Sequence, residues 1–245
     1  MHLETWPTRH YSEEDLRDTF DFMADRYVDQ TVVVSRGHYP EWMNQVASLV
    51  KAWKPKSVAD IGCGPGYLLR RLREAMPEAD ILGVDYSQKM LAQVPDDIPT
   101  AHEHLDDWAD SEEKTYDALI MTFVLRDQPD PVQSLTKLQK RLAKNGHLVI
   151  LETQTPDGWR HWGFNLYFHH WMPWWGRRVL APDWHGAQDM APYRWLSDSH
   201  RQWRESQSLP EVLRQLGYDG MESHRPPTDV VMLWSARATG LEAKA

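Results

Sequence analysis

The sequence predicts an α/β fold built on a mostly parallel sheet. Val58–Ile61 is a short apolar run of the kind found in buried strands, and three glycines follow it at alternate positions. Leucines then recur at helical spacing through Leu72, so a strand, a glycine turn and a helix follow in order. Further apolar runs alternate with helical patterns as far as Glu152. This alternation is typical of a doubly wound α/β unit.

The glycine turn has the composition of a ligand-binding loop. Gly62, Gly64 and Gly66 carry no side chains, so backbone amides can approach a ligand closely. The helix beyond would present its N-terminal N–H groups to the same ligand. An ordinary tight turn within an α/β domain is the alternative interpretation.

Two carboxylates flank this turn and indicate the class of ligand. Asp85 ends the next apolar run, where α/β nucleotide sites place an acid that binds ribose hydroxyls. Asp60 stands two residues before the first glycine, where its charge is unfavourable for the pyrophosphate of NAD. S-adenosylmethionine (SAM) brings an ammonium and a sulfonium group instead. An acidic entrance therefore favours SAM as the cofactor.

Composition and charge argue against several function classes. The chain of 245 residues has a formal net charge of -9, which disfavours nucleic acid as its main partner. Cys63 is the only cysteine, so no intrachain disulfide can form, as fits a reducing cytoplasm. Met1–His10 lacks the pattern of a signal peptide, and no apolar run reaches the ~18 residues of a membrane span. We therefore expect a cytoplasmic protein.

The remaining elements follow from periodicity and capping signals. N-terminal helices are expected over 11–53, one of them beginning near Pro40. Ser87 is placed to cap a short helix that runs through Met90, and a third strand is expected near Thr100–His104.

A fourth strand over Tyr116–Phe123 is followed by a helix whose apolar face includes Leu142, and then by a fifth strand over Gly146–Glu152. The intervening turn contains Asn145, which tolerates the left-handed conformation.

The loop and its flanks resemble a known enzyme superfamily. The segments D-I-G-C-G-P-G and V-D-Y-S-Q-K-M-L resemble motif I and the next acidic motif of class I SAM-dependent methyltransferases. Three further segments are similar to motifs of the ubiquinone/menaquinone biosynthesis C-methyltransferase family: F-D-F-M-A-D-R-Y-V-D, S-R-G-H-Y-P-E-W and L-R-D. The last ends in Asp127, where that family usually carries Asn. The resemblance covers roughly residues 18–237.

The resemblance implies a Rossmann-like, seven-stranded class I methyltransferase fold with N-terminal helices and a Trp-rich insertion after the fifth strand. The implied parts are an N-terminal helical lid over 1–53, a SAM-binding core over 54–155, a Trp/His-rich cap insertion over 156–209, and a C-terminal helix and final strands over 210–245. Simple packing of the N-terminal helices against the sheet is the alternative to a lid.

The resemblance also implies which residues bind SAM. In such enzymes an acid after the third strand bonds the adenine amino group, and Asp106 is the candidate, with Asp107 as the alternative. Trp108 would then cover the adenine face, whereas an exposed acidic loop is the other interpretation. The full set expected to bind the cofactor is Asp60, Gly62, Gly64, Gly66, Asp85, Tyr86, Met90, Asp106 and Thr122.

The chemistry of methyl transfer identifies candidate catalytic residues. The reaction is an in-line displacement that needs mainly positioning and electrostatics, and a carbon acceptor becomes electron-rich when a phenolic proton leaves. Arg126 could hold the resulting oxyanion through charge-assisted hydrogen bonds. Asp127 or Tyr27 could take the proton. A salt bridge from Arg126 to Asp127, Asp130 or another acid is the alternative role.

Tryptophan and histidine accumulate over Trp159–Trp184. An apolar acceptor pocket, a surface that rests on a membrane, and the core of a cap are the interpretations that fit. The histidines here do not have the spacing of a known metal site, so no metal is predicted.

The favoured function is SAM-dependent C-methylation of a quinol or related aromatic, apolar small molecule, with peripheral membrane contact as a further expectation. An O-, N- or S-methyltransferase of another small molecule is the alternative, favoured by Asp127 and the Trp-rich insertion. A non-catalytic SAM-binding protein is disfavoured by the presence of Asp60, Gly66 and Asp85.

Overall fold

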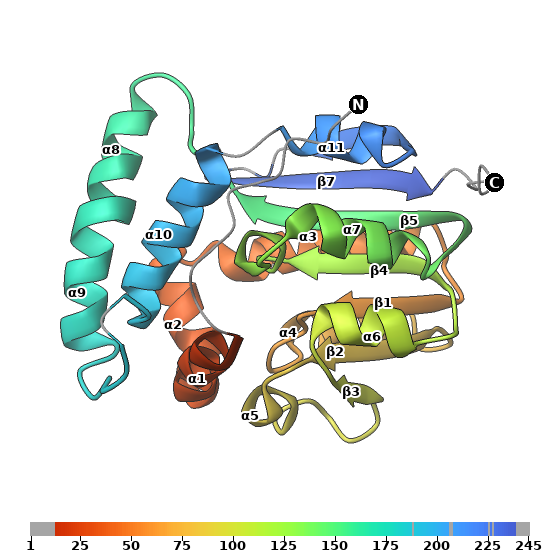
Figure 1. Cartoon of the computed structure of the whole chain (residues 1–245), viewed down its shortest axis with the longest axis horizontal. Helices are drawn as coiled ribbons and strands as arrows, with labels where there is room; N and C mark the ends of the chain where they lie inside the picture. The colour runs from red at the N-terminus through yellow and green to blue at the C-terminus, as the bar shows by residue number, and fades with distance from the viewer. Residues whose placement is uncertain (1–12, 188, 206–207, 225, 227, 239–245) are drawn as a thin grey trace.

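One seven-stranded sheet runs through the computed structural model, which describes residues 13–187, 189–205, 208–224, 226 and 228–238 (Figure 1). The strand order is β3-β2-β1-β4-β5-β7-β6, and β7 is antiparallel to both of its neighbours. The strands are β1 (Ser57–Ile61), β2 (Asp80–Asp85), β3 (Thr100–His102), β4 (Tyr116–Thr122), β5 (Leu142–Thr153), β6 (Tyr218–His224) and β7 (Val231–Ala238). The expected seven-stranded, mostly parallel sheet is confirmed.

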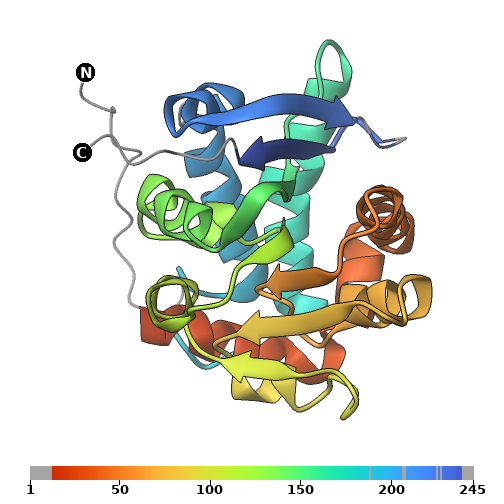
Figure 2. The same cartoon turned by 90° about the vertical axis from the view of Figure 1, so that its right-hand side faces the viewer.

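Helices cover both faces of this sheet (Figure 2). One face carries α3 (Tyr39–Ala52) and α4 (Tyr67–Ala75), and the other carries α6 (Leu105–Ser111), α7 (Pro131–Gln139) and α11 (Leu209–Gln215). Along β1, Val58 packs into the core under α3 and α4, whereas Ala59 and Ile61 pack into the opposite core. A strand buried on both faces must be apolar throughout, which explains the run that the sequence shows.

Two helical segments lie beyond the carboxyl ends of the strands, at the left of Figure 1. The first contains α1 (Glu13–Met23), η1 (Ala24–Arg26) and α2 (Tyr27–Val34), and the second contains α8 (Arg160–Leu166), the π turn η3 (Tyr167–Trp171), α9 (Met172–Val179) and α10 (Pro192–Glu205).

Buried polar contacts join these two segments although they are distant in sequence. The Tyr193 hydroxyl donates to Gln30 Oε1 at 2.7 Å, and Gln30 Nε2 donates to the Leu180 carbonyl at 2.8 Å. The Thr19 hydroxyl donates to the Met190 carbonyl at 3.0 Å. The N-terminal helices and the insertion therefore enclose a common space.

The elements fall within the expected segments 1–53, 54–155, 156–209 and 210–245, except that α11 begins at Leu209. The assignment of these segments to a lid, a core and a cap stays a prediction.

The start of β5 differs from the expected one. The strand begins at Leu142, which pairs with Tyr116, rather than at Gly146, and the helix before it ends at Gln139. Asn145 adopts φ +64° within this stretch, so the chain makes a left-handed turn without leaving the strand. Periodicity placed Leu142 on the helix because its side chain is buried in the same core as the helix face.

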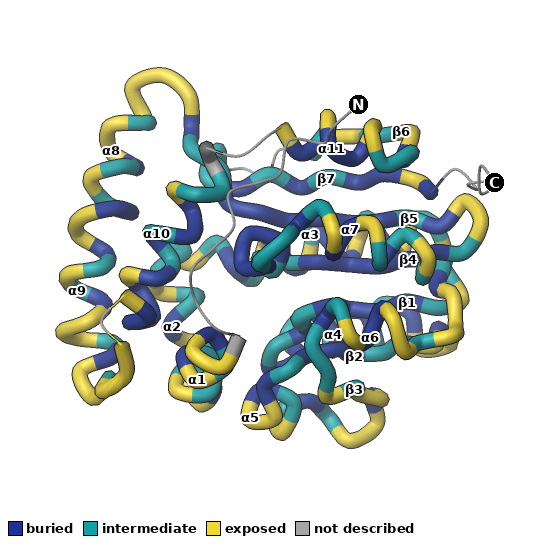
Figure 3. Tube along the Cα trace, viewed as in Figure 1, coloured by how far each residue is buried: buried dark blue, intermediate teal, exposed yellow. Residues whose placement is uncertain are grey.

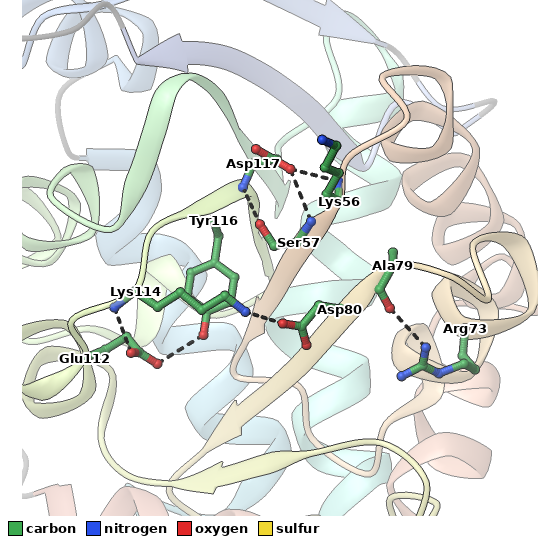
Figure 4. Close-up of polar contacts among 9 residues, drawn as sticks. All are labelled: Lys56, Ser57, Arg73, Ala79, Asp80, Glu112, Lys114, Tyr116 and Asp117. Carbon is green, nitrogen blue, oxygen red and sulfur yellow. Dashed lines mark hydrogen bonds and ion pairs between the residues drawn. The ribbon is translucent and has the colours of Figure 1, made fainter.

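Polar side chains tie the strands together at the amino edge of the sheet (Figure 4). Asp117 Oδ2 accepts hydrogen bonds from the backbone N–H groups of Lys56 (2.7 Å) and Ser57 (3.2 Å), and the Ser57 hydroxyl accepts one from the Asp117 N–H at 3.1 Å. Lys114 forms an ion pair with Asp80 in the same region. These groups join β1 to its neighbours.

Candidate active site

Two adjoining cavities lie at the carboxyl edge of the sheet, where open α/β proteins place their ligands. The large cavity has a volume of about 740 Å³ and the small cavity one of about 70 Å³. Phe20, Tyr27, Phe123 and Asp127 line both. Molecules bound in the two cavities would therefore meet at these four side chains.

Asp85 organises the wall of the small cavity. Its carboxylate accepts hydrogen bonds from the Gly64 N–H at 2.8 Å and from the Ser87 N–H at 2.9 Å. Burial raises the pKa of Asp85, and the Ser87 and Gly64 donors oppose that rise only in part. Ser87 in turn caps α5 (Gln88–Leu91), as expected, by accepting from the Met90 N–H. One carboxylate thus fixes the glycine loop to the start of α5.

Backbone conformation explains the three glycines of the loop. Gly62, Gly64 and Gly66 have φ values of 69°, 54° and 75°, a left-handed region that costs other residues ~1–2 kcal/mol. A Cβ at Gly62 would lie 2.3 Å from a methyl group of Val124, and one at Gly66 3.0 Å from Val94. A Cβ at Gly64 would meet nothing within 4 Å. Gly64 therefore leaves open space at the cavity wall.

Asp60 is buried behind the loop. It is 1% exposed, and neither carboxylate oxygen has a hydrogen-bond partner among the described residues. Burial, and then the neighbouring charge of Asp85, raise the pKa of Asp60 well above the usual value. A buried carboxylate is costly unless a donor or a cation pairs with it. This position therefore fits a ligand that brings an ammonium group.

Most residues expected to bind the cofactor are brought together. Those that line the small cavity are Gly62, Gly64, Asp85, Tyr86, Met90 and Thr122. Asp60 and Gly66 are not part of this lining: Asp60 is buried at the end of β1, and Gly66 precedes the first residue of α4.

The structure does not bring Asp106 to the cavity. β3 ends at His102, and Asp106 falls in the first turn of α6. Its carboxylate accepts a hydrogen bond from the Ser134 hydroxyl at 2.7 Å and forms an ion pair with Lys137 at 3.4 Å, both on α7. Trp108, expected over the adenine, is instead buried in the core below the sheet edge. A helix that the sequence analysis does not predict, α6, begins at Leu105 and turns both side chains away from the small cavity.

Glu103 is the acid that follows β3 and lines the small cavity. Its Oε2 accepts a hydrogen bond from Ser111 at 2.9 Å. Asp107, the alternative to Asp106, is exposed on α6. Glu103, rather than Asp106 or Asp107, therefore lies where an acid after β3 can contact a ligand in the small cavity.

Helix α1 covers the small cavity. Leu16 and Phe20 line it, and the Ser87 hydroxyl donates to Asp21 of α1 at 2.5 Å. Small-molecule sites usually enclose ~300–1,000 Å³, so a cavity of about 70 Å³ cannot admit a nucleoside-sized ligand as it stands. The cavity must therefore widen before such a ligand binds, and α1 forms one of its walls.

A buried cation and two carboxylates lie at one end of the large cavity. Arg126 Nη1 donates to Glu152 Oε1 at 2.5 Å, and Arg126 Nε lies 3.7 Å from Asp127 Oδ1. Burial alone would lower the pKa of Arg126, but the charges of Glu152 and then Asp127 raise it above the usual value. Arg126 thus forms the salt bridges of the alternative interpretation while also lining the cavity.

Tyr27 stands between the two cavities as a very weak acid. Burial raises its pKa to about 12, although the charge of Arg126 lowers it. A phenol with this pKa is protonated at neutral pH. Tyr27 can therefore donate a hydrogen bond to an oxygen of a bound molecule, and Asp127 is the better proton acceptor of the two.

Two features of the site have no counterpart in the sequence-based expectations. Glu152 pairs with Arg126, and the only local signal is an acid at the end of an apolar strand. Phe123 adopts φ +62°, a conformation that bulky residues rarely take, and its N–H donates to the Leu151 carbonyl at 2.9 Å. Strain of this kind clusters at functional sites, and Phe123 lines both cavities.

Within the described ranges, no helix combines the length and the apolar character needed to cross a bilayer. The same ranges contain no group of three or more His, Cys, Asp or Glu side chains that could hold a metal ion.

Comparison with known sequences gives a result consistent with this geometry. The model of the ubiE/COQ5 methyltransferase family matches residues 8–236. The demethylmenaquinone methyltransferase of Listeria welshimeri is 25% identical over 216 residues, which cover 84% of this chain and 88% of the relative. That of Thermotoga maritima is 26% identical over 204 residues, which cover 82% and 86%.

Solved structures share the fold at lower identity. The plantazolicin methyltransferase BpumL in complex with S-adenosylhomocysteine (SAH) aligns with a TM-score of 0.54 and 14% identity, over 92% of this chain and 96% of that one. The DhpI–SAH complex aligns with a TM-score of 0.59 and 16% identity, over 91% and 95%. These neighbours confirm the Rossmann-like class I methyltransferase fold.

Asp85 lines the small cavity and Asp106 does not, so their substitution should affect SAM binding differently. We expect Asp85→Ala to lower SAM affinity at least tenfold, because a lost charge-assisted pair costs ~2–4 kcal/mol and the glycine loop loses its anchor. Asp106→Ala removes an equal charge on α6 and should leave the affinity within about twofold. Titration calorimetry on both variants measures the difference. Equal losses of SAM affinity in the two variants would show that Asp85 does not make the ribose contact.

Protonation of Asp60 should control cofactor affinity. Its pKa is raised, so the carboxylate takes up a proton as the pH falls and can then no longer pair with an ammonium group. We expect SAM affinity to rise with pH above the ordinary carboxylate range, and this rise to be smaller in Asp60→Asn. Titration calorimetry at several pH values gives the affinity profile of the parent and of Asp60→Asn, and both proteins keep Asp85. Parallel pH profiles in the two proteins would contradict the pairing of Asp60 with the ammonium group of SAM.

Proposed function

The chain belongs to the ubiE/COQ5 methyltransferase family, and from that premise we propose that it transfers the methyl group of SAM to a ring carbon of a quinol-like aromatic acceptor. The observation that carries the proposal is the junction of the two cavities. A large cavity rich in aromatic side chains ends in Arg126 and Asp127, where it meets the cavity of the glycine loop. The relatives named demethylmenaquinone methyltransferases point to a quinone-related acceptor.

The small cavity and its surroundings supply partners for each part of SAM. Asp85 would accept hydrogen bonds from the ribose hydroxyls, and Asp60 would pair with the ammonium group. Glu103 takes over the role expected for Asp106 at the adenine end. The open space at Gly64 would admit the methionine part. A movement of α1 would then enlarge the cavity to the volume that SAM needs.

The polar end of the large cavity fits activation of a phenolic acceptor. Arg126 is held in place by Glu152, so its remaining donors are oriented before an oxyanion forms. Asp127 would take the phenolic proton, and the protonated Tyr27 would donate a hydrogen bond to the same oxygen. Phe123 lies between the donor and acceptor cavities and would restrict the ring to one approach for in-line transfer.

The rest of the large cavity fits an apolar substituent on that ring. Its lining includes Phe164, Tyr167, Phe168 and Trp195, and its volume is within the range of small-molecule sites. Thr153 also lines it, and the Thr153 hydroxyl has no hydrogen-bond partner among the described residues. This hydroxyl would bind a second ring oxygen. An acceptor with a long apolar substituent resides in a bilayer, so the proposal includes peripheral membrane contact.

A turnover assay over a panel of acceptors tests the reaction class. SAH release should be fastest with quinols, and the product should carry the new methyl group on a ring carbon by mass spectrometry and NMR. Turnover confined to simple phenols, amines or thiols would replace the proposal by O-, N- or S-methylation. Cofactor binding without turnover on any acceptor would indicate a non-catalytic role.

The geometry of Arg126 should matter more than its charge. Lysine keeps the charge, but its ammonium group lacks the planar set of N–H donors with which arginine can bond Glu152 and an oxyanion together. Arg126→Lys should therefore lower kcat by roughly 10²-fold with SAM affinity unchanged. The matched control is Arg160→Lys, which lines the same cavity near its exposed rim and should change kcat less than about threefold. Steady-state kinetics with a quinol provide the comparison. Normal turnover by Arg126→Lys would remove Arg126 from the mechanism.

A further inference from the structure

Residues 160–179 form one continuous helical column, which we call the outer helix, made of α8, η3 and α9. It stands at the left edge of Figure 1, and exposed segments recur along its outer side in Figure 3. On its inner side, Phe164, Phe168 and Met172 pack with Tyr193 into a small core. The fold therefore already uses one apolar face of this helix.

The opposite face is also apolar, and its ring contacts within the described structure are with side chains of the same helix, such as the stacking of Trp171 on Tyr167 and Trp175. The exposed large hydrophobic residues on or next to the outer helix are Trp159 (83%), Trp162 (82%), Leu166 (65%), Trp171 (44%), Trp174 (56%) and Val179 (54%). Only Phe22 and Val33 are comparably exposed elsewhere in the described ranges. We call the first five of these the tryptophan face; Val179 lies seven residues after Met172, so helical periodicity places it nearer the inner side.

The helix geometry keeps these side chains on one side. Trp159, Trp162 and Leu166 follow the three- and four-residue spacing of an α-helix. The π turn adds a residue to the repeat, so a spacing of five carries the face from Leu166 to Trp171. An exposed apolar stripe of this length indicates an interaction surface, because isolated surface hydrophobics do not align in this way.

The charge of this segment is opposite to that of the chain. Residues 158–182 contain three arginines and no Asp or Glu, whereas the whole chain has a formal net charge of -9. Arg177 and Arg178 are exposed at the end of the helix, and the Arg178 guanidinium lies 5.2 Å from the centre of the Trp174 ring. Tryptophan and arginine together favour the headgroup level of an anionic bilayer.

The same charges disfavour a second copy of the chain as the occupant. In a two-fold dimer through this face, the outer helix of the second copy would offer no carboxylate to Arg177 and Arg178, because residues 160–179 contain no Asp or Glu. An anionic lipid surface has no such conflict. Charge complementarity therefore selects the bilayer.

The outer helix also forms part of the wall of the large cavity. Phe164, Tyr167 and Phe168 line the cavity from within, and the exposed residues Trp159 and Arg160 line it at the start of the helix. Arg160 forms an ion pair there with Asp229, which lines the cavity as well. The cavity therefore reaches the surface beside the first tryptophan of the face.

We propose that the tryptophan face docks on an anionic lipid bilayer and holds the opening of the large cavity at the headgroup level. Docking depends only on the exposed face. Entry of the acceptor from the bilayer through this opening rests, in addition, on the proposed function.

Vesicle flotation tests the docking. Vesicles of phosphatidylcholine with about one third phosphatidylglycerol should bind the chain, and Trp162→Gln/Trp174→Gln should lower the partition coefficient at least tenfold. Arg177→Gln/Arg178→Gln should lower it about tenfold or more on these vesicles and little on pure phosphatidylcholine. The matched control is Lys140→Gln/Lys144→Gln, which removes two exposed charges far from the face and should bind nearly as the parent does.

Two further measurements separate docking from misfolding and from the acceptor proposal. Trp162 and Trp174 line neither cavity, so SAM affinity and turnover of a short-chain quinol in solution should be unchanged in the tryptophan variant. Turnover of a long-chain quinol in vesicles should fall about tenfold or more. Failure of the parent to float, equal flotation of the tryptophan variant, or a dimer that this variant dissociates would each overturn the proposal. Flotation without quinol turnover would overturn the proposed acceptor alone.

Discussion

Burial of charge at the carboxyl edge of the sheet is the constraint on which the rest of the structure depends. The buried Asp, Glu, Lys and Arg side chains of the described residues all lie there, and they are Asp60, Asp85, Arg126, Asp127 and Glu152. Four carboxylates are buried there with one guanidinium, which pairs with Glu152 and Asp127, so the repulsion among the carboxylates is offset only in part. A cationic cofactor reduces this imbalance, which explains why a site that raises the pKa values of Asp60 and Asp85 suits SAM.

The same constraint explains the helices beyond the sheet. Charges at a strand edge stay buried only if other elements cover them, and here α1, α2 and α8–α10 cover this edge and enclose the large cavity. Their joint packing depends on Gln30, which bonds to Tyr193 and to the Leu180 carbonyl. At the amino edge the polar groups are satisfied locally through Asp117, and no such cover is needed.

The sequence predicts those parts of the molecule that local pattern determines. The strands, the glycine loop, Asp85 and the cap at Ser87 all follow from periodicity and spacing over a few residues. The pairing of Arg126 with Glu152 joins the turn after β4 to the end of β5, 26 positions further along the chain, and no local pattern encodes it. The prediction for Asp106 depends on where β3 ends. The strand ends at His102, and Asp106 lies on α6, where it bonds to Ser134 of α7. Element boundaries are the least determined feature of a sequence pattern.

Helix α1 links the two cavities. Leu16 and Phe20 of this helix line the small cavity, and Phe20 also lines the large one. A displacement of α1 that widened the small cavity would therefore also reshape the wall of the large cavity. The cofactor and acceptor sites of the proposed function thus share one structural element, and a change in that element reaches both.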